Sequence, residues 1–431
     1  MELAGLSTDQ APPIAAPVRF FLTAPLFGIL AGILILLSDS ATLMNRFSME
    51  SIVITHAITI GFLSFIMLGS MTQMLPVLAG AKMPKVELVT KSSYILLVVG
   101  VISMLFGLYS GSTLFKIVAF IGLGGGFLII LTATALSLRT VVNFNATVRG
   151  ITTSVVFAFF IVFMGLYLLY SYITNDVNST HMIVANIHSV WAVFGFAVIL
   201  IIGVAFQVLP MFYVAPKFKS FCKKRVVWLI SIGLVIWMFL SAFFEEYTLV
   251  GKLWIAVFVW AFATTVWLKL SKRRRPISDV TVWYWRSASI FLTLGSFLWI
   301  FDEYFKHEYI VMVGILIGGF ILSIIIGMLY KIVPFLVWFH LNAMGYMSIP
   351  TINEMINKRV AQIQFVLFIA SLIGFIFSFY MPYLLDISAI SFIISMVLLE
   401  YNVISPILIY IKTKKTKPDF DMSMFEAPKE H

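Results

Sequence analysis

The sequence contains little charge: Asp, Glu, Lys and Arg make up 11% of its 431 residues, whereas soluble domains carry roughly 25%. Hydrophobic residues make up 61%, and the mean hydropathy is +1.03. Apolar stretches of about 20 residues recur along the chain, and each is long enough to cross a bilayer core. These features predict a polytopic membrane protein with lipid as its main partner.

Cysteine is almost absent, with Cys222 as the single example. One cysteine excludes an internal disulfide, a Cys-X-X-Cys metal site and covalent attachment of a c-type haem. Cys222 lies in a Lys-rich connection, "KFKSFCKKR", where we expect a free thiol, with palmitoylation as the alternative.

A single basic surface is also lacking, although the net charge is +10. The positive residues occupy alternate connections, such as "KFKSFCKKR" and "KLSKRRRP", and the connections between them are acidic or neutral. A nucleic-acid interface would be one contiguous patch, so this partner is excluded. The alternation follows the positive-inside rule and places both termini of a multi-pass protein in the cytoplasm. The start of the chain lacks the basic residues of a cleavable signal, so we expect a short soluble tail.

Twelve membrane spans are expected, all helical, because lipid leaves no partner for unpaired backbone groups. We expect one twelve-helix domain over residues 18–411, with cytoplasmic tails at 1–17 and 412–431. The spans are predicted at 18–40, 52–79, 92–110, 113–137, 150–173, 180–214, 225–246, 249–271, 283–302, 308–340, 358–381 and 385–411.

One unusual template occurs three times, in the second, sixth and tenth of these spans. It reads Gly-Phe, then Gly eight residues after the first, Gln or Lys four later and Pro three later. The copies are "GFLSFIMLGSMTQMLP" from Gly61, "GFAVILIIGVAFQVLP" from Gly195 and "GFILSIIIGMLYKIVP" from Gly319. Their spacing predicts three four-helix repeats, at about 18–140, 150–271 and 283–411, around a pseudo-threefold axis along the membrane normal.

The template itself is expected to serve packing, because small residues let helix backbones approach closely in lipid. Its Gly and Pro positions project to one side of a helix. The polar position, Gln73, Gln207 or Lys331, has two interpretations. The first is a cap at the membrane interface, with Lys331 snorkelling; the second is a convergent polar ring.

Two histidines, His56 and His188, lie inside expected spans at similar depth, ahead of the first Gly of their templates. An ionisable residue inside a membrane helix indicates function by default, and imidazole is the commonest metal ligand. A neutral histidine bonded to a nearby carbonyl or hydroxyl is the alternative. His181 and His307 are expected near the outer interface, and His340 near the inner one.

The directions of the two side chains leave the number of sites open. At about 100° per residue, His56 projects to roughly 220° and His188 to roughly 20° from the first Gly of each template. Equivalent positions around one axis are therefore not expected. Two separate pockets, or one pocket between neighbouring repeats, fit better.

Twelve helices in three groups of four, with His early in the second and sixth, resemble subunit I of the haem-copper oxidase superfamily. That resemblance implies that His56 matches an axial haem ligand and His188 a copper ligand. The seventh span, "RVVWLISIGLVIWMFLSAFF", has no His, and the tenth has none between His307 and His340. We also expect no carboxylate deep in a span to relay protons. An oxygen-reducing oxidase is therefore not expected.

The sequence is more similar to the divergent NnrS-like relatives of that superfamily. The resemblance rests on "APVRFFLTAPLFGILAG" and the Gln-X-Leu-Pro endings of two templates. It implies b-type, non-covalent haem, with copper also possible, held by His56 and His188. It also implies a role in nitric oxide or respiratory stress, with a diatomic gas and a membrane subunit or electron donor as partners. Arg19, Arg46 and Arg286 are the candidates for haem propionates.

Two other functions are left open by the sequence. A transporter of a metal, haem or small solute would need a polar path at mid-membrane, often with broken helices. An assembly or structural protein could keep the fold without the cofactor.

Overall fold

The computed structural model describes residues 12–274 and 279–420, which form helices and no strands. Of the expected tails, residues 1–11 and 421–431 lie outside the described residues. Helices occupy all twelve expected positions. In chain order the elements are α1 (Ala15–Leu36), α2 (Ser40–Leu43), α3 (Met49–His56), η2 (Ala57–Ser64), α4 (Phe65–Ala79), α5 (Val86–Ser110), α6 (Thr113–Arg139), α7 (Ala146–Thr174), α8 (Ser179–Val190), η3 (Trp191–Val198), α9 (Ile199–Tyr213), α10 (Ser220–Phe243), η4 (Glu245–Tyr247), α11 (Thr248–Ser271), α12 (Val280–Phe301), α13 (Ile310–Ala343), α14 (Lys358–Phe377) and α15 (Leu384–Thr413).

Within the described residues, eleven helices are long and apolar enough to cross a membrane. The ninth expected span, α12, is also a full helix, but Tyr284, Arg286 and several Ser, Thr and Trp residues make it less apolar. The protein is therefore all-helical with a multi-pass membrane architecture.

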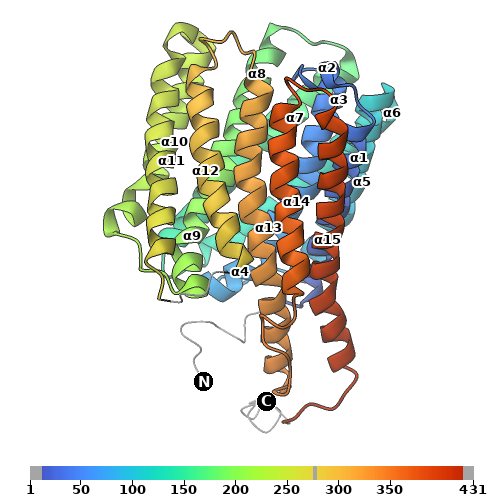
Figure 1. Cartoon of the computed structure of the whole chain (residues 1–431), viewed down its shortest axis with the longest axis vertical. Coiled ribbons are helices and arrows are strands. Elements are labelled where there is room, and N and C mark those ends of the chain that lie inside the picture. The colour runs from blue at the N-terminus through green and yellow to red at the C-terminus, as the bar shows by residue number, and fades with distance from the viewer. Residues whose placement is uncertain (1–11, 275–278, 421–431) are drawn as a thin grey trace.

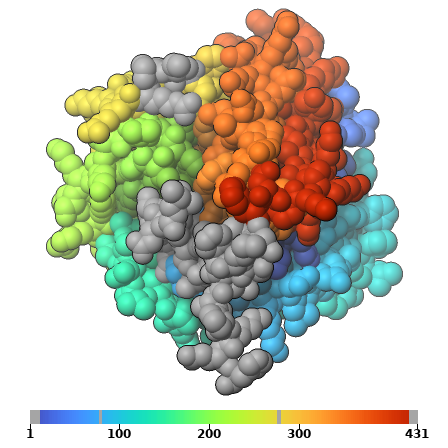
Figure 2. Space-filling model, turned by 90° about the horizontal axis from the view of Figure 1, so that it is seen from below, coloured from blue at the N-terminus to red at the C-terminus, as the bar shows by residue number. Residues whose placement is uncertain are grey.

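The helices stand side by side along the long axis of the molecule (Figure 1). We call the end that carries α2 the upper end, and the end where α4 and α9 finish the lower end. In the view from below, the chain colours follow one another around the face, and red lies beside blue (Figure 2). The contacts agree with this ring, because α6 packs on α7, α11 on α12 and α15 on α1.

The template glycines make close packing contacts, as expected, mostly with the helix that precedes them; the nearest contact of Gly319 is Leu372 of α14. A Cβ added at Gly61 would meet Phe27 of α1 at 2.5 Å, and one added at Gly195 would meet Phe157 of α7 at 2.6 Å. The second glycines make equally close contacts. A Cβ at Gly203 would lie 2.7 Å from the Cα of Gly150. No side chain fits at such distances, so these glycines allow the close helix crossings.

The expected interface caps at the template's polar position are wrong for two of the three copies. Gln73 is 4% exposed, and neither its oxygen nor its nitrogen has a partner. Lys331 is 6% exposed and pairs with Asp279, with Nζ 2.6 Å from Oδ2. Gln73 is thus buried without a partner, whereas Lys331 is held by an ion pair with Asp279, whose side chain is 38% exposed.

The expectation of no carboxylate deep in a span is also wrong. Glu400 lies within α15, and its Oε2 atom is buried without a partner. Its apolar neighbours keep the mean hydropathy of the span high, so hydropathy alone does not reveal it.

Two of the three template helices contain a π-helical segment. The segment η2 follows His56 directly, and η3 begins three residues after His188, so each includes the first template glycine. The third copy, in α13, is α-helical throughout. A π segment widens the helix and is frequent at functional sites.

Candidate cofactor site

His56 is the last residue of α3, in the upper half of the first template helix. The helix begins at Ser48, whose hydroxyl accepts a hydrogen bond from the backbone N–H of Ser51 at 3.1 Å. The Nδ1 atom of His56 lies 2.7 Å from the carbonyl oxygen of Ile52, one turn earlier. With its N–H at Nδ1, the ring donates this bond and keeps Nε2 as a free acceptor.

His188 occupies the corresponding part of the second template helix, on α8. The Asn178 side chain caps α8 by accepting from the backbone N–H of His181. The Nδ1 atom of His188 lies 3.1 Å from the carbonyl oxygen of Ile161 on α7. Gly165, one turn further along α7, makes room for the ring, since a Cβ there would lie 3.1 Å from Cε1.

The two imidazoles lie close together and nearly parallel. Their ring centres are 6.4 Å apart, and their planes are inclined by 25°. Both histidines tie Nδ1 to a backbone carbonyl, which is the usual arrangement of a metal-bound histidine. Metal–nitrogen bonds of about 2.0–2.1 Å, plus the ring radius, place two imidazoles on opposite sides of one ion with centres about 6 Å apart. The observed separation fits that arrangement.

The structure therefore brings His56 and His188 into one pocket between two neighbouring groups of helices. One of the two arrangements left open by the sequence is confirmed, and two separate pockets are excluded.

The histidines line a cavity of about 620 Å³. Most of its wall is aliphatic or aromatic, including Leu63, Phe194, Trp299 and Phe392. This size lies within the usual range for sites that enclose a small organic ligand. A bare metal ion would fill only a small part of it.

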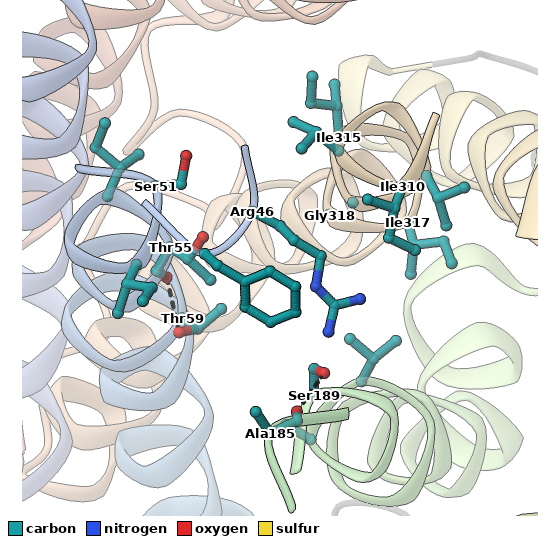
Figure 3. Close-up of a pocket in the computed structure, with 18 of the residues that line it drawn as sticks. Arg46, Ser51, Thr55, Thr59, Ala185, Ser189, Ile310, Ile315, Ile317 and Gly318 are labelled. Carbon is teal, nitrogen blue, oxygen red and sulfur yellow. Dashed lines mark hydrogen bonds between the residues drawn. The ribbon is translucent and has the colours of Figure 1, made fainter. Parts of the chain in front are cut away.

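Polar side chains in the wall come mainly from the connections and helix ends at the upper end. Arg46 donates a hydrogen bond to Asn186, and Figure 3 shows its guanidinium pointing into the cavity between Ser189 of α8 and Ile317 of α13. Lys252 is 4% exposed and pairs with Glu303, with Nζ 2.9 Å from Oε1. The cavity thus has an apolar body and a charged upper rim.

The α13 side of the cavity carries two glycines that no packing contact requires. A Cβ added at Gly314 or Gly318 would meet nothing within 4 Å. Gly318 faces the cavity in Figure 3, and both residues line it. Gly314 stands five residues before Gly319, which is the template position of His56 in the first copy. At the template position where the first copy has His56, the third copy therefore has Gly314 with open space beside it.

Of the other sequence candidates, His181 and His307 also line the cavity, whereas His340, Arg19 and Arg286 do not. His181 is 3% exposed and packs edge-to-face on Tyr172. His340 is half-buried in the lower part of α13. Arg19 bonds the carbonyl of Ala15, and Arg286 stacks over Trp267. Of the three arginines, Arg46 is the one at the cavity.

The sequence reading missed the groups of the rim, Lys252, Asp302 and Glu303. Lys252 lies near the start of α11, and Asp302 and Glu303 directly follow α12. The signal that could have identified them was a charge at the expected outer end of a span.

No group of three or more His, Cys, Asp or Glu side chains that could hold a metal occurs in residues 12–274 and 279–420. Comparisons with protein-family models and with curated proteins find no match for the chain.

Proposed function

We propose that the protein binds one b-type haem non-covalently, with His56 and His188 as its two axial ligands. The observation that carries the proposal is the pair of imidazoles whose ring centres are 6.4 Å apart, each with Nδ1 bonded to a carbonyl. Two copper–imidazole bonds would suit the same ring spacing. The cavity of about 620 Å³ favours the larger cofactor over a lone copper ion.

The walls of the cavity suit an amphipathic macrocycle. The aliphatic and aromatic residues would hold its apolar body, and the open space beside Gly314 and Gly318 leaves room for a flat ring. The cation that Arg46 projects into the cavity would stabilise a carboxylate group. Lys252 is already paired with Glu303, so Arg46 is the better propionate partner.

A haem held by two imidazoles supplies reversible one-electron transfer, tuned by its axial ligands and burial. His56 and His188 would orient it, and the apolar wall would exclude water. Because both residues are positioned as ligands, the site suits an electron carrier better than a gas binder. A membrane subunit or other donor would supply the electron.

The oxidase-subunit-I-like architecture, with three four-helix repeats, is part of the same proposal. Its support is the recurring pattern of contacts, in which the first helix of each group packs on the template helix and the fourth on the next group. We further propose that the chain lies in a bacterial inner membrane with its upper end outside, on the distribution of Lys and Arg.

A transporter is the weaker candidate. It would need a route from the cavity to the lower end, and there the described core is closed. Leu75, Ile202, Leu209, Ile326 and Val333 are fully buried below the cavity. A cavity that is closed toward the lower end favours a resident cofactor over a passing solute.

Single substitutions of the two histidines test the proposal. Purified His56→Gly and His188→Gly are expected to lose the reduced-minus-oxidised haem bands of the wild type, and added imidazole is expected to restore them. His340→Gln, at a histidine away from the cavity, is the matched control and should keep full bands. Wild-type bands in both glycine variants would refute the ligand assignment.

A further inference from the structure

A second set of groups connects the cavity with the solution at the upper end. It lies in the connection between α12 and α13, where His307 and Asp302 form a pair with Nδ1 2.6 Å from Oδ2. The His307 side chain is 58% exposed, whereas that of Asp302 is 3% exposed. Both residues line the cavity. One end of the pair therefore meets water, and the other end is buried.

The second oxygen of Asp302 has no partner. Oδ1 is buried and accepts no hydrogen bond from any described residue. A buried carboxylate oxygen without a donor is costly, and the cost falls if the group takes up a proton or meets water. Uptake of a proton by the Asp302 carboxyl group would therefore lower this cost.

The backbone of the connection is strained to hold this pair. Lys306 and His307 both have left-handed conformations, with φ of 50° and 63°. This conformation costs non-glycine residues roughly 1–2 kcal/mol each. The strain turns the chain back, so that the N–H of His307 donates to the carbonyl of Asp302 at 2.9 Å. Strain of this kind often marks a functional position.

The charged residues next to the pair either form hydrogen bonds and ion pairs of their own or stay charged. Burial acts to raise the pKa of Glu303, but hydrogen bonds from Thr248 and Lys252 outweigh it and keep the pKa below its ordinary value. Burial lowers the pKa of Arg46, and the charge of Asp302 partly offsets this effect. Glu303 is thus anionic at neutral pH and does not carry protons there.

Four more titratable groups belong to the surroundings of the pair. His181 of α8 and Glu245 of η4 line the same cavity, and Lys306 and Glu308 are exposed in the connection itself.

We infer that His307 and Asp302 exchange protons between the solution at the upper end and the cavity. In the inward direction, a hydronium ion in the solution gives its proton to Nε2 of His307 and leaves as water, as the Nδ1 proton passes to Oδ2 of Asp302. The imidazole is neutral before and after, and the carboxylate becomes a neutral carboxyl group. Rotation of that group brings its O–H to the cavity. The reverse sequence releases the proton.

The exchange would matter to a cofactor in the cavity, and in that respect it rests on the proposed function. An added electron increases the proton affinity of nearby groups, because the charges interact strongly in a medium of low dielectric constant. A proton path would let the site neutralise each electron that it receives.

Infrared spectroscopy of the purified protein tests the inference without requiring haem. When a drop in pH delivers protons to the pair, infrared difference spectra of the wild type should gain the C=O band of a protonated carboxyl, and spectra of Asp302→Asn should lack it. In His307→Gln the band should exchange its proton for deuterium at least about 100-fold more slowly. Glu308→Gln, which removes an exposed carboxylate from the same connection, should behave as the wild type. Identical spectra in wild type and Asp302→Asn, or wild-type exchange in His307→Gln, would overturn the relay.

A second readout uses the haem-loaded protein. The midpoint potential should fall as pH rises in the wild type, and it should depend less on pH in Asp302→Asn. Protein that contains no haem would contradict the proposed function, and the infrared result would still decide the relay.

Discussion

At the scale of single residues, Gly165 is the position on which the orientation of His188 depends. An added Cβ would lie 3.1 Å from Cε1 of His188, so the ring must shift by a few tenths of an ångström. We expect Gly165→Ala to weaken iron binding by His188, and Gly165→Val to weaken it more. The measurement is the low-spin fraction in the visible spectrum of the haem protein.

Gly125 offers a control for that change. A Cβ there would meet Leu96 at 3.4 Å, which is an ordinary contact. Gly125→Ala should leave the spectrum unchanged and stabilise its helix by up to about 1 kcal/mol. A Gly165→Val protein with a wild-type spectrum would show that His188 is not held against α7 for ligation.

Single residues also mark what the sequence could predict about the site. His56 and His188 could be selected because ionisable groups are rare in apolar spans. Their mutual orientation could not, because the projection assumed about 100° per residue between each histidine and its glycine. The π segments η2 and η3 lie in that interval, and no residue pattern in the sequence predicted them. Asp302 and Lys252 were missed because their importance arises from contacts between distant segments.

At the scale of helices, alanine substitutions at Gly203 and Gly318 are expected to have opposite effects on stability. Gly203→Ala would place a Cβ 2.7 Å from the Cα of Gly150 and force α7 and α9 apart. We expect a loss of roughly 1–3 kcal/mol, which is typical of overpacking. Gly318→Ala meets open space, so helix propensity should stabilise α13 by up to about 1 kcal/mol.

Thermal unfolding in detergent, without added haem, measures both effects. The melting temperature should fall for Gly203→Ala and rise for Gly318→Ala. The larger Gly318→Leu should then reduce haem content, because its side chain enters the cavity. Equal shifts for the two alanine variants would contradict the distinction between packing and cavity glycines.

At the scale of the whole molecule, the positions of the helices were predictable because apolar length is a local property. The ends of α11 and α13 fall within a few residues of the expected 249–271 and 308–340. The burial of Gln73 and Lys331 was not predictable, because it depends on neighbours from other segments. The same applies to the pairing of Lys331 with Asp279 across 52 residues.

The orientation of the molecule in the membrane can be tested with one thiol at a time, since Cys222 is the single cysteine. In a Cys222→Ser background, Tyr304→Cys places a thiol at an exposed position of the upper end, and Lys415→Cys places one at the lower end. A membrane-impermeant thiol reagent should label the first in intact cells and the second after permeabilisation. The reverse pattern would contradict the orientation drawn from the positive-inside rule.

The most direct test of the central claim is the haem stoichiometry and spin state of the purified wild-type protein, produced with adequate haem supply. Iron analysis and the visible spectrum should give one b-type haem per chain. Low-temperature electron paramagnetic resonance should show a low-spin ferric iron with two imidazole ligands. Colourless protein without iron would contradict the account. So would a high-spin haem whose spectrum does not change when His56 and His188 are substituted.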